Sequence, residues 1–401
     1  MRILIVGQYF WPETFRINDL ALGLQERGHE VTVFTGKPNF HTGHFYNGYS
    51  FFGKSKENWQ GIPIYRAPLI TRGSGKGIRL ILNYLSFAIF GSIKALFVKI
   101  PAEVILVYQQ SPVILAFPGI VYKWKNKAKL VLYVQDLWPE SVTATTNIKG
   151  GFVIRVLNSI TNWIYRRSDT ILIQSNAFRH FLESRNVAAD KIVYLPNTAE
   201  SLYQKMEKLP ELAHYFPGEM NIVFAGTIGA AQSFETLLAA AKLVKEKDPG
   251  ICWVIIGDGR MREDLIGLAK KENLEDVFKF IGFFELEKMP LFFAYADALL
   301  ISLKKDLIFS LTVPAKLQSY MACGKPVIGS LDGEGSRIIL DADCGLCSGA
   351  EDVDGLARNV LEFRRISVLE RERLGGNALA YYRKEFERDK LLVRLEEVLE
   401  K

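Results

Sequence analysis

Short apolar runs and longer amphipathic segments follow one another along most of the chain. Residues 2–10 (RILIVGQYF) form an apolar run typical of a buried strand, and residues 17–27 have helical periodicity. Residues 29–36 (HEVTVFTG) then indicate a second strand, and Gly28 marks the end of the helix before it. These elements predict one βαβ unit at the start of the chain.

The same pattern recurs in both halves of the chain. Further strand-like runs lie at residues 61–68, 102–110, 129–136, 169–175 and 191–197, and later at 221–229, 252–259, 278–284 and 296–303. Helical segments separate several of them, among them residues 234–247. Strands that alternate with helices form parallel sheets covered on both faces. We therefore predict an α/β protein built from doubly wound, Rossmann-like units.

The length of 401 residues and a break in the pattern predict two domains. Across residues 199–219 the strand pattern lapses, and Pro210, Pro217 and Gly218 appear. The expected order is a first domain at 1–198, a connection at 199–219, a second domain at 220–376 and a C-terminal helix at 377–401. We expect this charged helix to cross back to the first domain.

The stretch Val313–Gly329 (VPAKLQSYMACGKPVIG) carries the clearest local signal. It predicts a loop, a short helix that ends at Gly324, and a buried strand, with Pro314 in the first helical turn. In open α/β sheets, ligands bind beyond the carboxyl ends of the strands, where a helix N-terminus offers free backbone amides. Lys316 adds a positive charge there, so we expect an anionic ligand, a diphosphate.

Charge is distributed unevenly along the chain. The net charge is +6, but residues 1–200 carry +11 and residues 201–401 carry −5. A basic first half suggests contact with nucleic acid or with an anionic membrane. Because no nucleic-acid motif accompanies the charge, the membrane is the favoured partner and nucleic acid is not expected.

The apolar segment at residues 79–99 (RLILNYLSFAIFGSIKALFVK) bears on the membrane question. It is close to the length of a membrane span but contains Lys94 and several polar residues. Three interpretations remain open: a buried helix of the α/β domain, a helix that lies in the membrane interface, and a spanning helix.

The positions of the cysteines indicate a reducing compartment, and the first residues bear on secretion. The four cysteines, Cys252, Cys323, Cys344 and Cys347, lie in apolar or helical runs, and we expect no disulfide, zinc or redox role. The first apolar run enters the first strand without a cleavage region, so no cleavable signal peptide is expected.

Seven short motifs follow one another through the chain. They are RGHEVTVFT (27–35), PNT (196–198), FAGTIG (224–229), IIGDGRMREDL (255–265), FIGFFELEKMP (280–290), ADALLISL (296–303) and PAKLQSYMACGKPVIG (314–329). In this order they resemble the GT-B glycosyltransferases of the retaining family 4 type. The resemblance implies two Rossmann-like domains that face each other across a cleft, and retaining sugar transfer from a nucleotide sugar.

A finer resemblance rests on four motifs. PETF (12–15), PNFHTGHF (38–45), VQDLWPES (134–141) and PAK-QSY (within 314–320) resemble bacterial O-antigen and capsule enzymes, in particular L-fucosamine (N-acetylfucosamine) transferases. This implies a UDP-sugar donor, an acceptor linked to a polyprenyl diphosphate, and a cytoplasmic enzyme bound peripherally to the inner face of the cytoplasmic membrane.

The chain departs from the broad family at two places. The family's Glu-x7-Glu pattern has a second Glu that binds the donor ribose, and here Ser319 occupies its place. Thr227 and Gln232 stand where a basic pair commonly binds the diphosphate. Lys316 and Arg260 are the expected replacements, because strand-to-helix turns position both.

The donor site is expected at the glycine-rich turns and the Lys316 helix. Glycines at 226–229 and 257–259 allow the backbone to approach a nucleotide closely. The expected donor-side residues are Gly226, Thr227, Gly229, Gln232, Gly257, Asp258, Gly259, Arg260, Phe283, Pro314, Ala315 and Ser319. Helix dipole and cations can neutralise a diphosphate, so no metal or other cofactor is expected.

Acceptor chemistry is expected in the first domain. Glu13 and Asp136 follow predicted strands and are the candidate catalytic carboxylates, together with Lys316 at the donor. The other acceptor-side candidates are Pro12, Asn18, His41, His44 and Glu140. The fragment RGSGKG (72–77) lacks the spacing of a phosphate-binding P-loop.

Two other functions share these sequence features. A nucleotide-sugar epimerase can have a similar two-domain fold without a lipid acceptor. A non-catalytic nucleotide-sugar-binding subunit would account for the missing Glu of the family pattern.

Overall fold

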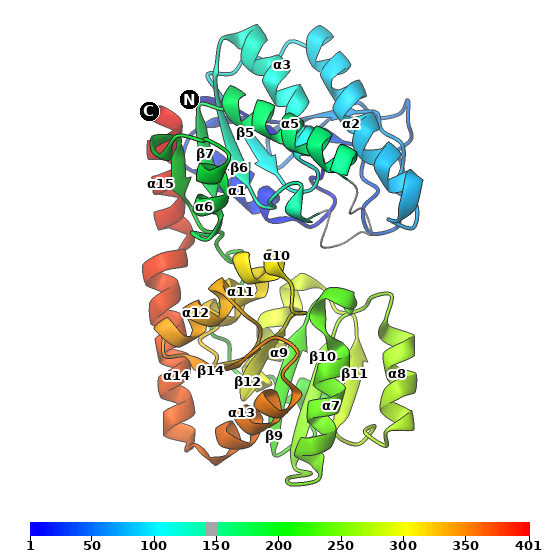
Figure 1. Cartoon of the computed structure of the whole chain (residues 1–401), viewed down its shortest axis with the longest axis vertical. Helices are drawn as coiled ribbons and strands as arrows, with labels where there is room; N and C mark the ends of the chain where they lie inside the picture. Colours follow the sequence, from blue (N-terminus) through cyan, green and yellow to red (C-terminus); the bar gives the residue numbers. More distant parts are fainter. Residues whose placement is uncertain (142–150) are drawn as a thin grey trace. The chain divides into compact units, whose positions relative to one another are not determined.

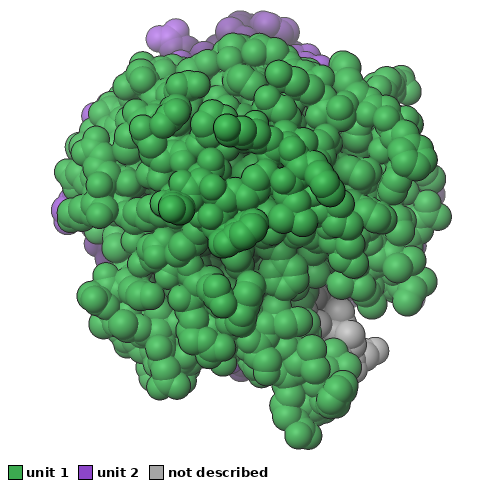
Figure 2. Space-filling view, turned by 90° about the horizontal axis from the view of Figure 1, so that it is seen from above, with its two compact units in different colours: residues 1–196, 389–401 green, residues 197–388 purple. Residues whose placement is uncertain are grey.

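A computed structural model of the chain describes residues 1–141 and 151–401 (Figure 1). The chain forms two compact units, coloured separately in Figure 2. The first unit comprises Met1–Pro196 together with Asp389–Lys401, and the second comprises Asn197–Arg388. Residues 199–219, expected to connect the domains, lie in the second unit.

The first unit contains a sheet in the strand order β3-β4-β2-β1-β5-β6-β7-β8. The strands are β1 (Arg2–Val6), β2 (Glu30–Gly36), β3 (Lys56–Trp59), β4 (Ile62–Ala67), β5 (Val104–Gln109), β6 (Lys129–Val134), β7 (Thr170–Ile173) and β8 (Ile192–Tyr194). All neighbours pair in parallel except β3, which is antiparallel to β4. The carboxyl ends of the parallel strands therefore meet at one edge.

Helices cover both faces of this sheet. They are α1 (Arg16–Glu26), α2 (Gly77–Phe97), η1 (Val113–Ala116), α3 (Phe117–Asn126), α5 (Gly151–Arg167), α6 (Phe178–Ser184), η2 (Ala189–Lys191) and α15 (Arg388–Glu400). Apolar side chains of α1 and α15 share one core with β1, β2, β5 and β6. On the other face, Gly119 of α3 packs against Val107 and Ile105, and α2 and α5 both contact η1 (Figure 1).

The second unit has a parallel sheet in the order β11-β10-β9-β12-β13-β14. The strands are β9 (Met220–Ala225), β10 (Ile251–Ile256), β11 (Phe278–Gly282), β12 (Ala298–Ser302), β13 (Val327–Ser330) and β14 (Gly345–Ser348). The α-helices are α7 (Phe234–Lys245), α8 (Arg262–Lys271), α9 (Met289–Tyr295), α10 (Leu307–Leu311), α11 (Ala315–Ala322), α12 (Glu334–Asp341), α13 (Val353–Arg365) and α14 (Val368–Tyr381). Three 3-10 turns, η3 (Pro210–Tyr215), η4 (Ala230–Gln232) and η5 (Leu286–Lys288), and a π-helical turn, η6 (Tyr382–Phe386), complete the described elements of this unit.

Two cores fill the faces of the second sheet. One contains side chains of α7, α8 and α13, and the other contains side chains of α9, α11 and α12. Alternating residues of β9 belong to opposite cores: Ile222 faces the first and Val223 the second. This is the arrangement expected of a strand covered on both faces.

The predicted fold class, two α/β units with parallel sheets, is confirmed. The sequence pattern did not indicate two edge strands, β3 and β14. The sequence of β3, KENW, is polar and half-exposed, and β14 has only four residues. Strands this short or this polar leave little apolar signal in the sequence. The stretch 377–401, expected as one helix, contains the end of α14, η6 and α15.

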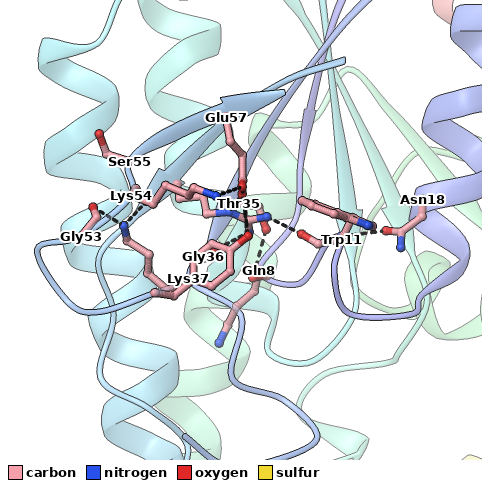
Figure 3. A network of polar contacts seen from close by, with 12 residues as sticks. Gln8, Trp11, Asn18, Thr35, Gly36, Lys37, Gly53, Lys54, Ser55 and Glu57 are labelled. Atoms are coloured by element: carbon pink, nitrogen blue, oxygen red, sulfur yellow. Dashed lines mark hydrogen bonds and ion pairs between the residues drawn. The ribbon is translucent and has the colours of Figure 1, made fainter. Parts of the chain in front are cut away.

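A buried network of charged groups holds the loop after β1 and the loop between β2 and β3 (Figure 3). Arg66 is fully buried, pairs with Glu57, and donates from Nη1 to the carbonyl oxygen of Gly36 at 2.9 Å. Lys37 donates to the backbone carbonyls of Gly53, at 2.6 Å, and Lys54. Burial lowers the pKa of Lys37 to about 8. Backbone carbonyls thus replace water around these cations.

Helix α2 packs with only one side. Its buried positions are Asn83, Ser86, Phe87, Ala88, Gly91 and Ala95. Eight large apolar side chains on it are between 41% and 83% exposed: Ile78, Ile81, Leu82, Leu85, Ile89, Ile93, Leu96 and Phe97. By length and composition alone, α2 is the one helix among the described residues that could cross a membrane, and 33% of its most apolar window is buried. We call these eight exposed residues the apolar face of α2.

We expect Leu395→Ala to destabilise the first unit. Leu395 of α15 is 0% exposed in the core shared with β1 and β5. Its truncation leaves a cavity, which should lower the free energy of unfolding by about 2–5 kcal/mol. The measurement is the midpoint of urea unfolding. Leu369→Ala is the control, because Leu369 of α14 is 77% exposed and its loss should cost less than about 0.5 kcal/mol. Equal midpoints for the two variants would contradict the packing of α15.

Candidate functional site

In the second unit, two glycine-containing turns lie against each other beyond β9 and β10. Gly226 and Gly257 have φ values of 139° and 140°, which side-chain-bearing residues rarely adopt. A Cβ atom at Gly257 would lie 2.0 Å from the carbonyl oxygen of Gly226. The amide of Ile228 donates to the carbonyl of Asp258 at 2.9 Å, which links the two turns. Glycine is therefore required by the close approach of the turns.

Lys316 lies directly beside the first of these turns. It is the second residue of α11, and a Cβ atom at Gly226 would lie 2.8 Å from its Nζ. The Nζ lies 3.5 Å from the centre of the Phe224 ring, a cation–π contact. No carboxylate of residues 1–141 or 151–401 forms an ion pair with Lys316. Burial lowers the pKa of this ammonium to about 7.

Helix α11 is anchored to the end of β9 through Tyr320, near the C-terminal end of the helix. The amide of Ala225 donates to the Tyr320 hydroxyl at 3.1 Å, and that hydroxyl donates to the Ala225 carbonyl at 3.3 Å. Pro314 is the N-cap residue, and Gly324 follows the helix in the left-handed region at φ 64°. The predicted helix, with its proline start and glycine end, is thus present.

The other predicted donor-side residues differ in their contacts and in their exposure to solvent. Gln232, with its amide oriented to satisfy both carbonyls, donates to Gly229 at 3.0 Å and Thr227 at 3.2 Å. Asp258 accepts a hydrogen bond from the Gly259 amide at 2.8 Å. Ser319 is buried in α11. Thr227, Ala315, Arg260 and Phe283 are exposed, the last two on loops after β10 and β11.

In the first unit, Glu13 lies under the loop that follows β2. Its side chain is 1% exposed, and its Oε1 accepts the backbone amides of Asn39, at 2.6 Å, and Phe40. Burial raises the pKa of Glu13 to about 7, although both amide hydrogen bonds oppose the shift. The Glu13 carboxylate therefore holds the 38–45 loop in place. This structural role is independent of any role in sugar transfer.

Asp136 lies at the carboxyl end of β6. The Ser111 hydroxyl donates to its Oδ2 at 2.6 Å, and the Trp138 indole donates to Ser111 Oγ at 3.1 Å. Burial raises the pKa of Asp136, and the hydrogen bond from Ser111 opposes this. This half-buried carboxylate, held in a fixed orientation, is suited to accept a proton or a sugar hydroxyl.

The remaining acceptor-side candidates have structural partners. Asn18 donates to the Glu13 carbonyl at 2.8 Å, and Glu140 pairs with Arg185. His41 and His44 are exposed on the 38–45 loop, and Pro12, half-buried, follows a cis peptide bond. Burial and the charge of Arg72 both lower the pKa of His41.

Sequence reasoning missed three side chains that shape these sites. Phe224 carries Lys316 on its ring, Tyr320 ties α11 to β9, and Ser111 orients Asp136. Ser111 follows the carboxyl end of β5, so its position after a predicted strand was an available signal. Phe224 and Tyr320 lie in apolar runs typical of core residues. Nothing in the sequence distinguishes them from other core residues.

Possible metal ligands do not gather in the part of the chain that the structure describes. Across residues 1–141 and 151–401, no three His, Cys, Asp or Glu side chains are placed to hold a metal ion together. The cations of the donor-side region are Lys and Arg side chains.

Comparison with protein families identifies both units. Residues 14–198 match the family described as "Glycosyl transferase 4-like domain", and residues 214–380 match "Glycosyl transferases group 1". The chain belongs to the GT-B glycosyltransferases. The order of the two domains is that expected from the seven motifs.

Known proteins resemble this glycosyltransferase over different lengths. A 2-deoxystreptamine N-acetyl-D-glucosaminyltransferase of Niallia circulans is 22% identical over 140 residues, 35% of each chain. The chain aligns with less than half the length of each of the curated relatives that it matches. Among solved structures, sucrose-phosphate synthase of Thermosynechococcus elongatus has a TM-score of 0.74 at 17% identity, covering 99% of this chain and 98% of the other. Anabaena HepE, solved with UDP and glucose, has a TM-score of 0.70 at 15% identity, covering 100% and 99%.

We expect UDP binding to this glycosyltransferase to take up a proton through Lys316. With a pKa of about 7, Lys316 is mostly neutral at pH 8 when the site is empty, and a diphosphate raises that pKa because it favours the ammonium. Binding at pH 8 should therefore take up close to one proton, and affinity should fall as pH rises above 7, by at most about tenfold per unit. Calorimetry in buffers of different ionisation enthalpy measures the uptake.

The control is Lys316→Arg, which keeps a positive charge at all these pH values. This variant should bind UDP without proton uptake. Equal uptake by the wild type and Lys316→Arg would place the titrating group elsewhere.

Proposed function

We propose that this glycosyltransferase moves a sugar from a UDP-sugar, with retention, to an acceptor linked to a polyprenyl diphosphate at the inner face of the cytoplasmic membrane. The observation that carries the proposal is Lys316, an ammonium without a carboxylate partner among the described residues, at the start of α11 and beside the Gly226 turn. A cation held in this way is available to a diphosphate.

The chemistry of sugar transfer explains the need for such a group. The anomeric C–O bond of the donor breaks while negative charge grows on the leaving diphosphate. Lys316 and the positive end of the α11 helix dipole can stabilise that charge without rearrangement. Because Gly226 has no Cβ atom, the Lys316 side chain can lie against the turn that follows β9. A metal ion is then unnecessary.

A lipid-linked acceptor is proposed because of the apolar face of α2. Between Glu57 and Asp169 the sequence has 14 Lys or Arg and only three acidic residues, Glu103, Asp136 and Glu140. The α2 sequence itself contains no Asp or Glu. Exposed apolar side chains flanked by cations suit an interface with an anionic bilayer. Since the buried side of α2 packs in the first unit, interfacial contact is favoured over spanning.

The same surface extends onto neighbouring helices. Trp124 of α3 and Phe152 of α5 are 74% and 76% exposed, and α3 and α5 contain no acidic residue. Aromatic side chains beside cations are frequent at the boundary between lipid and water. Together with α2 they support peripheral attachment through the first unit.

The proposed sugar is an N-acetylated amino-deoxyhexose such as L-FucNAc, for O-antigen or capsule assembly. This rests on the resemblance of the PETF, PNFHTGHF, VQDLWPES and PAK-QSY motifs. An epimerase of similar fold has no use for an apolar membrane face. A non-catalytic subunit would bind UDP-sugar without turning it over, which activity measurements decide.

We expect Lys316→Ala to lower the rate of sugar transfer by about a hundredfold, because one preorganised charge contact to the leaving group is lost. The measurement is UDP release from a UDP-sugar in the presence of a polyprenyl-diphosphate-linked acceptor. Addition of EDTA should leave the wild-type rate unchanged.

Lys304→Ala is the matched control, because Lys304 lies on the loop after β12 and its loss should change the rate less than about twofold. A Lys316→Ala variant that works at the wild-type rate would remove Lys316 from the donor site. Loss of activity in EDTA would refute the metal-free mechanism.

We expect the double variant Ile89→Asp/Ile93→Asp to bind vesicles containing phosphatidylglycerol at least about tenfold more weakly than the wild type. Each isoleucine side chain contributes up to about 1.5–3 kcal/mol to the free energy of membrane binding when its apolar surface leaves water. The introduced carboxylates also repel the anionic lipid. Flotation of the full chain with vesicles measures binding, which added salt should also weaken.

Val368→Asp/Leu369→Asp on α14 is the control, since these side chains are 70% and 77% exposed in the second unit. Equal binding by both double variants would contradict attachment through α2.

A further inference from the structure

Arg72 has an unused hydrogen-bonding capacity in the first unit. Its Nη1 is buried and has no hydrogen-bond partner, and no ion pair joins it to any of residues 1–141 or 151–401. A buried donor on a charged group is costly to leave unpaired. A group that the protein itself does not supply would account for it.

The position of the Arg72 side chain is determined from three sides. Its backbone amide donates to Asn39 Oδ1 at 2.9 Å, and its guanidinium carbon lies 4.1 Å from the centre of the Phe40 ring and 5.9 Å from that of Tyr9. Ring contacts occupy the flat face of a guanidinium and leave its N–H edge available. The stacked side chain is therefore preorganised to receive an oxyanion.

A buried amide network supports this arrangement. Asn83 of α2 donates to Asn39 Oδ1 at 3.2 Å and to the Ile70 carbonyl at 2.6 Å, and Gln8 donates to Asn83 Oδ1 at 2.8 Å. The network links the ends of β1 and β2 to α2 and to the segment that carries Arg72. The side chains of this network are neutral amides, so the network itself does not neutralise Arg72.

The groups around Arg72 are rings, an uncharged donor, His41 and one buried carboxylate, Glu13, whose Oε1 already accepts the amides of Asn39 and Phe40 and on which the charge of Arg72 acts. Tyr84 of α2 lies close enough for the charge of Arg72 to act on its hydroxyl, and Asp136 acts on the same hydroxyl in the opposite direction. Burial raises the pKa of Tyr84, so its hydroxyl stays protonated and can donate. Arg72 thus lies near both the candidate carboxylate Asp136 and the helix with the exposed apolar face.

We propose that Arg72 binds a phosphate group of the acceptor's lipid diphosphate. The inference rests on the proposed function in one respect, the lipid-linked acceptor, and it adds the residue that recognises the acceptor's charged group. A phosphate is favoured because α2, which supplies Tyr84 and Asn83 on its inner side, presents apolar residues on its outer side. The phosphate of a membrane lipid lies next to such a surface.

The test uses calorimetry with farnesyl diphosphate and with inorganic pyrophosphate, added to the full chain. Arg72→Gln should bind both ligands about tenfold to a hundredfold more weakly, as expected for loss of a charged hydrogen-bond partner. UDP binding should be unchanged, and so should the binding of farnesol, which lacks the phosphates.

Arg79→Gln is the matched control. Arg79 carries the same charge on the same segment, but it already donates to the Thr71 carbonyl at 3.3 Å and the Thr71 hydroxyl at 3.0 Å. This variant should bind farnesyl diphosphate as the wild type does. If circular dichroism shows that Arg72→Gln does not fold, Arg72→Lys replaces it as the test variant. It keeps the positive charge and most of the side-chain methylenes, so its binding of farnesyl diphosphate should be weakened less.

Three outcomes overturn the inference. The first is equal binding of farnesyl diphosphate by Arg72→Gln and the wild type. The second is loss of UDP binding in step with farnesyl diphosphate binding, which would assign Arg72 to the donor's diphosphate. The third is a wild type that binds neither probe. If UDP binds normally in that third case, the donor half of the proposed function stands without the Arg72 site.

Discussion

Parallel pairing of strands is the constraint on which both units depend. Parallel neighbours run in one direction, so their carboxyl ends meet at one edge, and every loop that leaves that edge can contribute to a common site. In the second unit this edge carries the Gly226 and Gly257 turns and the start of α11. In the first it carries Tyr9, Asn39 and Asp136, after β1, β2 and β6. Only β3, at the outer edge of the first sheet, pairs in the other direction among the described strands.

Several charged groups at these edges are separated from water, and the protein stabilises them through different kinds of contact. Arg66 is neutralised by Glu57, Lys37 is solvated by backbone carbonyls, and Glu13 accepts two backbone amides. Lys316 and Arg72 rest on aromatic rings, and neither forms an ion pair with a described residue. Arg66 also lies over a ring, that of Tyr49, but Glu57 neutralises it. Rings attract a cation without neutralising it, so Lys316 and Arg72 are the two of these cations held on rings without an ion-pair partner.

Much of the fold could be predicted from the sequence, because buried parallel strands are continuous apolar runs. The α11 helix and its lysine were also predictable, since proline, glycine and a buried strand follow in a fixed local order. Predictions failed to include β3 and β14, whose few residues carry no apolar alternation. The contacts of Arg72 with Asn39 and Phe40 join segments more than 30 residues apart, and no local pattern records them. Whether Glu13, Asp136 and Lys316 are catalytic stays a prediction.

The position of α15 has a consequence for the synthesis of this protein. Five α15 side chains complete a core whose other members come from residues 1–195: Leu391, Leu392, Leu395, Val398 and Leu399. A ribosome makes them only after the whole of the second unit. The second unit, continuous from Asn197 to Arg388, can close while the first still has an open apolar surface. Domains usually fold in the order of their synthesis. Here the unit that emerges first is the last to be finished, and until then its incomplete core is exposed to chaperones.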